Sequence, residues 1–310
     1  MGGEGMNEEN LSFQDTDFSK LVKKAKRTSY IKTIVISVTV CLVLAVSLYL
    51  SGTILLQKRL DHLSEIEAAW QYVKGANIED TGTSYLYTPF GATLISGQIK
   101  DLDGMPFPWG ERQQSLSIWG PVRTTQSVQV FGQGEVNDER IPLYYKGERV
   151  IEFFHPEIEY AYLPDERDLL NKIDENKIVE FAFSFAQPIT TEEAKALFAD
   201  HVNWYWVDTY RKEDLEDDTI GTIGNDAFGF SEDGSVELFM NQVEWLAEHG
   251  GTYKQQSNKM IKALKDKQGW ESESLPIIGV VVTGSPNELK QYMNVPLIRT
   301  AILGVTVDRY

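Results

Sequence analysis

The strongest pattern in the sequence is an apolar run near its beginning. Residues 33–57 carry no charge over 25 positions, and fourteen of them are Leu, Ile or Val. A helix rises about 1.5 Å per residue, so this run can cross a hydrocarbon core of about 30 Å. It is too long for a signal-peptide core, and Lys58 and Arg59 follow it instead of a small-residue cleavage site. We therefore predict a transmembrane helix over 33–57.

Helical periodicity continues on both sides of this run. Beyond it, an apolar stripe predicts that the helix extends to about Val73, through Leu56, Leu60, Leu63, Ile66, Trp70 and Val73. The stripe lasts barely two heptads, which favours packing against the chain's own following domain over a dimer seam.

Before the run, a polar, Gly-rich start over 1–14 gives way to a short amphipathic helix, and either Met1 or Met6 can be the natural start. This helix can lie on anionic headgroups or dock on a protein, and the two alternatives are equally favoured. Its candidate partner-contact residues are Phe13, Phe18, Leu21, Val22, Lys23 and Lys24.

The middle of the chain, residues 58–150 after the span, predicts the juxtamembrane helix followed by a β-rich region. Short β-type runs punctuated by Gly and Pro stand at 84–87, 127–131 and 149–154. Residues 105–110 hold two prolines and a glycine around two aromatic residues, which predicts a rigid packed turn. Trp109 in this segment is expected to pack in the core, with ligand stacking as the alternative.

The C-terminal part, residues 151–310, contains one pattern twice. Each copy reads strand, proline turn, helix, strand, and each ends in Val-Asp-x-Tyr: 178–185, 191–198 and 202–210, then 277–283, 287–293 and 302–310. Thr190 and Glu193 form a candidate capping box before the first of these helices. Two tandem βαβ units predict an α+β fold of ferredoxin-like type.

Between the two copies lie an acidic loop and two predicted helices. The helices cover 236–248 and 252–267, and the loop covers 213–218. The loop lacks the alternating Asp pattern and terminal Glu of a calcium-binding loop, so we expect it to be a solvated surface segment.

Charge changes the picture of the two sides of the membrane. Six Lys or Arg residues precede the span, whereas only Lys58, Arg59 and Lys74 lie within a similar distance after it. The positive-inside rule places the tail, residues 1–32, in the cytoplasm and the rest outside. The outer part carries 23 basic and 41 acidic residues out of a total net charge of −17. This balance argues against nucleic acid or anionic lipid headgroups as partners of the outer part.

Candidate chemistry in the sequence is sparse. The sole cysteine, Cys41, lies in the span, and no catalytic or cofactor-binding motif occurs. His155 with Glu157 is a weak candidate for part of a metal site, and a structural histidine is the favoured alternative. Asp208 and Asp308 end equivalent strands, where Asp usually accepts from turn amides. We predict a protein without enzymatic activity, cofactor or metal.

Four strings carry a family resemblance. They are F-x-x-L-V-K-K-A-K-R at 18–27, P-F-P-W-G at 106–110, F-F-H-P-E-I at 153–158 and V-N-W-Y-W-V-D-T-Y at 202–210. With the short tail and single span, the chain resembles the sigma factor regulator family, membrane-anchored anti-sigma factors of Gram-positive bacteria for extracytoplasmic-function sigma factors. The resemblance covers the region around the anchor and the C-terminal region from about Tyr145.

The resemblance implies a cytoplasmic sigma factor as the partner, held directly or through a small membrane co-regulator. Anti-sigma factors usually use a cytoplasmic domain of about twice this tail's length, which makes direct sequestration by the tail a departure from the usual pattern. The outer domain is expected to sense envelope state through an envelope ligand or protein. Its candidate structural or sensing residues are Trp109, His155, Trp204, Trp206, Asp208 and Tyr210.

Two functions of other classes stay open at this stage. The first is an envelope-binding or scaffold protein whose tail only stops transfer. The second is a membrane-tethered hydrolase, for which no residue in the sequence is nominated as catalytic.

Overall fold

The computed structural model describes residues 8–126, 135–136, 139–215, 221–267 and 274–309. The predicted β-type run at 127–131 lies outside these residues. The chain divides into two units, Met1–Lys58 and Arg59–Tyr310, and each is described by itself. The predicted division of the outer part near residue 150 stays a prediction.

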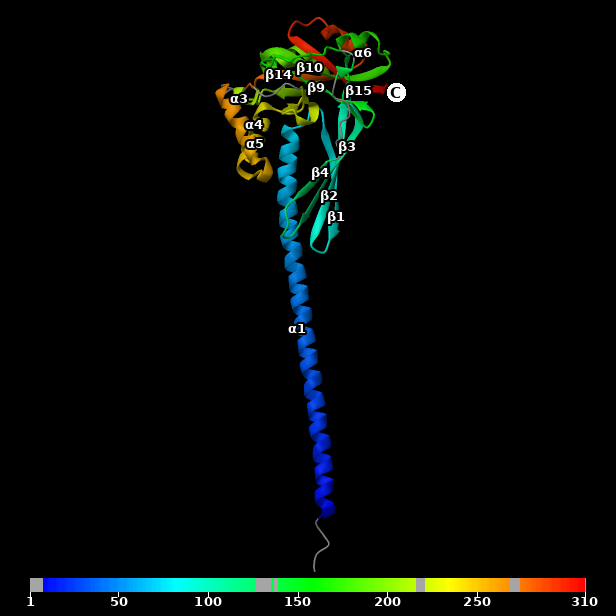
Figure 1. Ribbon diagram of the computed structural model, residues 1–310, viewed down its shortest axis with the longest axis vertical. Helices are drawn as coiled ribbons and strands as arrows, with labels where there is room; N and C mark the ends of the chain where they lie inside the picture. The colour runs from blue at the N-terminus through cyan, green and yellow to red at the C-terminus, as the bar shows by residue number, and fades with distance from the viewer. Residues whose placement is uncertain (1–7, 127–134, 137–138, 216–220, 268–273, 310) are drawn as a thin grey trace, which may run out of the picture. The chain divides into compact units, whose positions relative to one another are not determined.

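The first helix, α1, spans Glu8–Val73 and contains the whole predicted membrane span (Figure 1). Its apolar part fits a single-pass membrane anchor, since an 18-residue window has a mean hydropathy of 2.5 and is not buried in the protein. Hydroxyl side chains inside the span donate to carbonyls one turn back, as Thr39 does to Val35 at 2.9 Å and Ser51 to Ser47 at 2.8 Å. These bonds satisfy the hydroxyls without water.

An antiparallel sheet in the order β1-β2-β3-β4 follows α1 in the chain. Its strands are β1 Glu79–Thr88, β2 Gly91–Leu102, β3 Met105–Ser117 and β4 Arg123–Gln126. The β2–β3 turn has Asp103 and Gly104 at φ 56° and 80°, the left-handed pair that two-residue hairpin loops require.

The structure corrects the turn predicted at 105–110, because this segment is the first half of strand β3. Pro106 and Pro108 fit there because, among the described residues, β4 pairs only with 112–115 of β3, so no described strand needs the N–H groups that the prolines lack. The register shifts opposite Gln98 and Ile99, so Trp109 is the extra residue of a bulge. The expected packing of Trp109 is confirmed, since its ring is buried.

The C-terminal sheet has the order β13-β11-β14-β10-β15, with antiparallel neighbours throughout. Its strands are β10 Lys177–Ile189, β11 Val202–Val207, β13 Gly229–Ser231, β14 Ile277–Gly284 and β15 Ile298–Asp308. The strands of each predicted βαβ unit are parallel and separated by one strand of the other unit, as in a split βαβ arrangement. The α+β class is confirmed, while the ferredoxin-like assignment stays a prediction.

Helices of this unit begin close to their predicted positions. The capping box of Thr190 and Glu193 is confirmed, and Ser285 and Glu288 form a second one at the equivalent place in the repeat. The helices are α2 Thr191–Phe198, α3 Lys212–Leu215, α4 Val236–His249, α5 Lys254–Asp266 and α6 Pro286–Leu289. The remaining described strands have two residues each: β5 Glu135–Val136, β6 Glu139–Arg140, β7 Tyr144–Tyr145, β8 Glu148–Arg149, β9 Glu152–Phe153 and β12 Thr222–Ile223.

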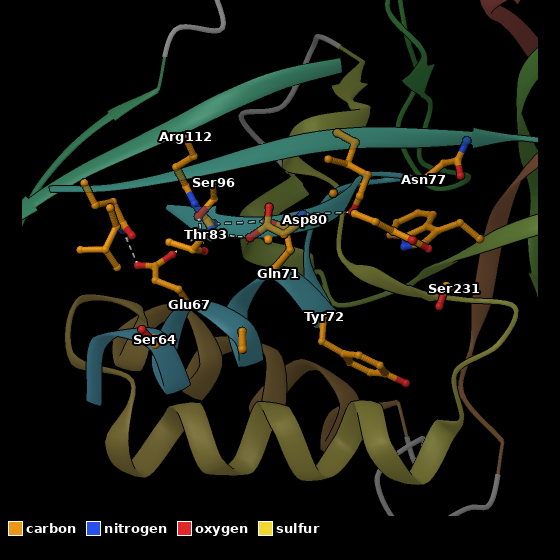
Figure 2. A pocket seen from close by; sticks show the side chains of 18 of the residues that line it. Ser64, Glu67, Gln71, Tyr72, Asn77, Asp80, Thr83, Ser96, Arg112 and Ser231 are labelled. Atoms are coloured by element: carbon orange, nitrogen blue, oxygen red, sulfur yellow. Dashed lines mark hydrogen bonds and ion pairs between the residues drawn. The ribbon is translucent and has the colours of Figure 1, made fainter. Parts of the chain in front are cut away.

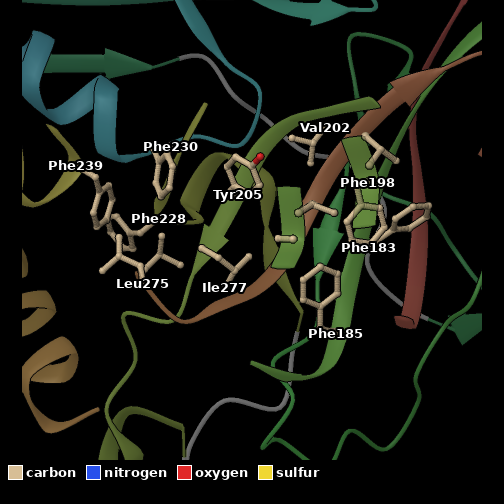
Figure 3. Close-up of a cluster of buried hydrophobic side chains, with 14 of the residues drawn as sticks. Phe183, Phe185, Phe198, Val202, Tyr205, Phe228, Phe230, Phe239, Leu275 and Ile277 are labelled. Atoms are coloured by element: carbon tan, nitrogen blue, oxygen red, sulfur yellow. The ribbon is translucent and has the colours of Figure 1, made fainter. Parts of the chain in front are cut away.

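The main hydrophobic core lies on one face of the C-terminal sheet (Figure 3). Alternate residues of β10, among them Phe181, Phe183 and Phe185, meet Phe198 of α2 on this face. The last turns of α1 join the same core through Ile66, Ala69, Trp70 and Val73. The prediction that the α1 stripe packs on the chain's own domain is thereby confirmed.

Candidate functional site

A cavity of about 440 Å³ lies against the last turns of α1 (Figure 2). One wall is α1, and the opposite wall comes from β1, β2 and β3. Residues of β11 and β13 complete the lining. The β1–β4 sheet and the five-stranded C-terminal sheet therefore both meet α1 at this cavity. The charged and polar side chains of the lining include Glu67, Gln71, Glu79, Asp80 and Arg112, and Trp204 adds an aromatic surface.

Arg112 of β3 is the central group of the cavity wall. Its guanidinium is buried and reaches Asp80 Oδ2 at 2.6 Å and Glu67 Oε2 at 3.1 Å. It also donates to Gln71 Oε1 at 3.2 Å. Strand alternation turns Arg112 inward toward α1, and a buried guanidinium needs such partners to offset its lost hydration.

Glu67 of α1 connects three elements. Its Oε1 accepts from Gln114 Nε2 at 2.7 Å and from the Tyr253 hydroxyl at 2.9 Å. The Tyr253 ring stacks on Trp70 of α1, with centroids 4.1 Å apart and planes 4° from parallel. Burial raises the pKa of Tyr253, and the neighbouring Glu67 carboxylate raises it further, so the phenol stays a donor.

We call Glu67, Gln71, Asp80, Arg112, Gln114 and Tyr253 the juxtamembrane cluster. It joins α1 to β1 and β3 on one side and to the start of α5 on the other. A polar network with this many hydrogen bonds in a low dielectric restrains the position of each member. The position of the last turns of α1 is therefore tied to the state of this cluster.

The cavity has an excess of carboxylates. Burial raises the pKa of Asp80, and Arg112 offsets this only in part. Burial also raises the pKa of Glu79, with repulsion from Asp101 and Asp233 adding to the shift. Three lining carboxylates therefore face one guanidinium, which favours a ligand that carries a cation or hydrogen-bond donors.

Three buried polar atoms beside the cavity have no hydrogen-bond partner among the described residues. Glu67 Oε2 is one of them and faces the Arg112 guanidinium in an ion pair, and the other two are Arg112 Nε and Gln98 Oε1. Gln98 and Arg112 also line a smaller recess of about 40 Å³. Buried polar atoms are usually satisfied, so these two are available to a small polar ligand that enters beside the carboxylates.

A second buried cluster contains most of the predicted sensing residues. His155 Nδ1 accepts from the Glu157 N–H at 3.2 Å, so Nε2 carries the proton that faces Asp208 Oδ1 at 3.2 Å. The Tyr210 ring meets His155 edge-on at 5.3 Å. The favoured structural role of His155 agrees with this burial, and the described residues hold no group of three His, Cys, Asp or Glu side chains arranged for a metal.

Asp208 is held as an anion in this cluster. Burial would raise the pKa of Asp208, but the hydrogen bond from His155 and the charge of Lys267 together bring it below its ordinary value. It also accepts from the Tyr210 amide at 3.3 Å, as expected for a strand-terminal Asp. Its repeat counterpart Asp308 is instead exposed and pairs with Lys177 at 2.5 Å.

The two tryptophans of the string at 202–210 point to the second face of the sheet. Phe153 packs on Trp206 and Trp204 with ring centroids 4.8 and 6.0 Å away. The strings at 153–158 and 202–210 therefore fold against each other. Trp206 is fully buried, whereas Trp204 also lines the cavity beside α1.

Trp109 lies apart from these clusters. Its ring covers the ammonium of Lys100 at 4.2 Å, and Lys100 Nζ lies 2.7 Å from Glu180 Oε2 in a buried ion pair. Burial lowers the pKa of Lys100, and Glu180 partly restores it. This pair joins β2 to β10, which gives Trp109 a structural place between the two sheets.

The predicted contacts of the tail are on the first part of α1. Phe18 and Leu21 are exposed by 68% and 64%, and Val22, Lys23 and Lys24 are exposed as well. The side chain of Phe13 lies outside the described part of the chain. The structure thus leaves these residues available and does not test what they bind.

Sequence reasoning did not find the juxtamembrane cluster. Arg112 and Glu67 are far apart in sequence, and each looks like an ordinary surface charge. The available signal was Glu67 itself, an acidic residue next to Ile66 in the apolar stripe. The sequence indicated the stripe but could not pair it with β3.

Comparisons with known proteins identify two matching segments. Residues 19–93 match the family model described as sigma factor regulator N-terminal, and residues 170–305 match the one described as sigma factor regulator C-terminal. The segment from Tyr145 to Leu169 and the strings at 106–110 and 153–158 lie outside both matches. No curated protein and no solved structure matches the chain.

Proposed function

The chain belongs to the sigma factor regulator family, and from this premise we propose that it is an anti-sigma factor that reports the state of its outer domain to its cytoplasmic tail. Membership in this family implies interaction with a sigma factor. In the proposal, the sigma factor is of the extracytoplasmic-function type. The tail is cytoplasmic, and the unit Arg59–Tyr310 lies outside.

The observation that carries this proposal is the extent of α1. One helix contains the exposed tail residues, the apolar span and the residues that line the cavity. The helix has no proline or break between Glu8 and Val73. A change at Glu67 or Gln71 therefore acts on the same element that presents Phe18 and Leu21.

In this proposal, the juxtamembrane cluster is where a bound ligand or a deformation of the domain changes the position of α1. Any event that draws Arg112 away from Glu67 leaves a buried carboxylate on α1 without its cation. Such a carboxylate is costly, so the helix favours a new position in which Glu67 is solvated or paired again. A ligand can shift the equilibrium between the two helix positions only by as much as its binding free energies for them differ.

The tail is short for a protein that sequesters a sigma factor alone. Phe18, Leu21 and Val22 form one exposed apolar side of α1, with Lys23 and Lys24 beside it. This surface suits one helix-sized contact on a sigma factor or on a small membrane co-regulator that completes the binding site. Both partners require the same apolar residues, so one pair of substitutions tests the surface.

The test is recovery of the sigma factor with the full chain from solubilised membranes. Changing Phe18→Asp and Leu21→Asp together puts two carboxylates on the apolar side, and we expect recovery to fall strongly. The matched control is Lys20→Gln with Arg27→Gln, which changes the net charge by the same amount on the other side of the helix. Unchanged recovery with the Asp pair refutes the tail contact.

The regulatory role itself is tested by deletion of the gene. Loss of an anti-sigma factor should give constitutive transcription from promoters that depend on its sigma factor. A sigma-factor gene beside this one would indicate which sigma factor is regulated, and so which promoters to measure. Unaltered transcription would instead favour a non-catalytic envelope scaffold.

A further inference from the structure

The β1–β4 sheet ends in two loops whose large apolar side chains are exposed. One loop joins β1 to β2, and the other joins β3 to β4. The Phe90 and Trp119 rings, one from each loop, stack with centroids 6.0 Å apart, and Trp119 is 79% exposed. With Leu86 and Tyr87 from the end of β1, we call these side chains the aromatic tip: Leu86, Tyr87, Phe90, Trp119 and Val122.

Arg59 fixes the aromatic tip beside α1 within the compact unit. Its guanidinium donates to the carbonyls of Ser117 at 2.5 Å, Ile118 at 2.7 Å and Gly120 at 2.9 Å. The Ile118 N–H in turn donates to the Phe90 carbonyl at 2.9 Å. Both loops are therefore held at the level of Arg59.

Arg59 also marks the end of the membrane span along the chain. It comes two residues after Gln57, the last residue of the uncharged run, and so about 3 Å further along a helix. The headgroup region on each side of the hydrocarbon core is about 5 to 7 Å thick. Arg59 and the loop carbonyls that it binds therefore lie in or next to the headgroup region. This inference rests on the distance along the chain and does not depend on the orientation of the unit Arg59–Tyr310.

Charge is distributed in the sheet as this location requires. Residues 81–99 contain no charged side chain, and Arg123 is the only one within 113–126. The carboxylates of the sheet, such as Glu79, Asp80 and Asp101, stand at its other end. The chain has a net charge of −17, so an uncharged half of a sheet fits contact with a surface that repels acidic groups.

We propose that the aromatic tip inserts into the bilayer interface from which α1 emerges, so that the outer unit rests on the lipid surface. Trp and Tyr favour this zone because their rings are amphipathic. The adjoining Arg59 and Arg123 suit the phosphate layer. The occupant of the exposed patch is lipid rather than a second copy, because the loops of the patch bind Arg59, which follows the predicted span by two residues in the chain.

This inference deepens the proposed sensing role without depending on the sigma factor contact. The same β-sheet carries the aromatic tip at one end and Arg112 of the juxtamembrane cluster in its middle. A change in lipid packing or bilayer tension at the tip would reach Arg112 through β3. The state sensed then includes the bilayer itself.

The experiment measures the environment of single labelled positions in the full chain in lipid nanodiscs. Cys41→Ser provides a cysteine-free background, since Cys41 is the sole cysteine. A nitroxide is then placed by Trp119→Cys or by Phe90→Cys. Tyr162→Cys, an exposed aromatic site away from the tip, is the control.

Accessibility to oxygen, which concentrates in lipid, is compared with accessibility to a water-soluble nickel chelate. At positions 119 and 90 we expect the oxygen-to-nickel ratio to be several times that at position 162. Equal ratios at all three positions overturn the proposal. Spin–spin broadening at 119 that disappears on dilution with unlabelled chain also overturns it, because it identifies a second copy as the occupant.

A second measurement keeps the wild-type loops intact. Lipids brominated near the headgroup should quench wild-type tryptophan fluorescence more than that of Trp119→Phe. Equal quenching of the two proteins contradicts insertion of Trp119. Neither readout involves the sigma factor, so failure of the membrane contact and failure of the regulatory role are distinguishable.

Discussion

At the scale of single residues, Arg112 is the group on which the juxtamembrane cluster depends. It is buried between Glu67 and Asp80, and Tyr253 and Gln114 complete the bonding of Glu67. Removing one partner of a buried ion pair costs about 3 to 5 kcal/mol, more than exposed pairs contribute. Substituting Arg112 should therefore destabilise the fold more than substituting an exposed charged residue.

Arg112→Gln should lower the free energy of unfolding by about 3 kcal/mol, because Glu67 and Asp80 then stay buried without a cation. The measurement is the denaturation midpoint of the full chain in detergent. Arg123→Gln, which removes a charge from the neighbouring strand β4, should change it by less than about 0.5 kcal/mol. Equal effects of the two substitutions would contradict the cluster.

Glu79 gives a prediction about pH. Burial and the charges of Asp101 and Asp233 raise the pKa of Glu79 in the folded chain above its ordinary value. The folded state then binds a proton at a pH where the unfolded state does not, so this group adds stability as pH falls from 7 toward about 4.5. Glu79→Gln should therefore be the more stable protein at pH 7, with the advantage shrinking at pH 5.

Melting temperatures of wild type and Glu79→Gln at pH 7 and pH 5 provide the check. Glu65→Gln, which removes an exposed carboxylate of α1, is the control and should show no such dependence. If the melting temperature of Glu79→Gln exceeds that of wild type by more at pH 5 than at pH 7, the raised pKa of Glu79 is contradicted.

At the scale of elements, the start of α5 is fastened to α1 through Tyr253. Its ring stacks on Trp70 and its hydroxyl donates to Glu67. Tyr253→Phe keeps the stack and removes a hydrogen bond to a charged group, which should cost about 1.5 to 3 kcal/mol. Tyr162→Phe is the matched control at an exposed site, and hydrogen exchange should show lost protection in α5 only for the first variant.

Elements defined by local chemistry could be predicted from sequence. The capping box at Thr190, the helices that follow it and the end of α1 at Val73 all rest on short-range periodicity and caps. The segment 105–110 was predicted as a turn because prolines break regular structure. It is a strand because the described part of β4 pairs only with 112–115, and which residues a neighbouring strand covers is a property of the whole sheet.

The candidate site was predictable only in part. The string at 202–210 pointed to residues that do gather, with His155 brought beside Asp208 and Tyr210. The pairing of Arg112 with Glu67 depends on the register of β3 against α1, and no local pattern encodes that register. Trp109 was grouped with the sensing residues, yet its contacts are with Lys100 at the junction of the two sheets.

At the scale of the whole molecule, α1 is the element that connects the proposed working parts. The proposed tail contacts lie at its start, the apolar span forms its middle, and the juxtamembrane cluster holds its end. The matches to the N-terminal and C-terminal family models cover the span and most of the second sheet, which agrees with a regulator built around this connection.

The most direct measurement is the amount of sigma factor recovered per membrane-resident chain for Arg112→Gln, a change remote in sequence from the tail. We expect recovery to change although the tail is wild type. Phe239→Ala, which opens the main core away from the cluster, controls for general destabilisation and should leave recovery per resident chain near wild type. If Arg112→Gln leaves recovery unchanged while the Phe18 and Leu21 substitutions abolish it, the outer unit does not control the tail.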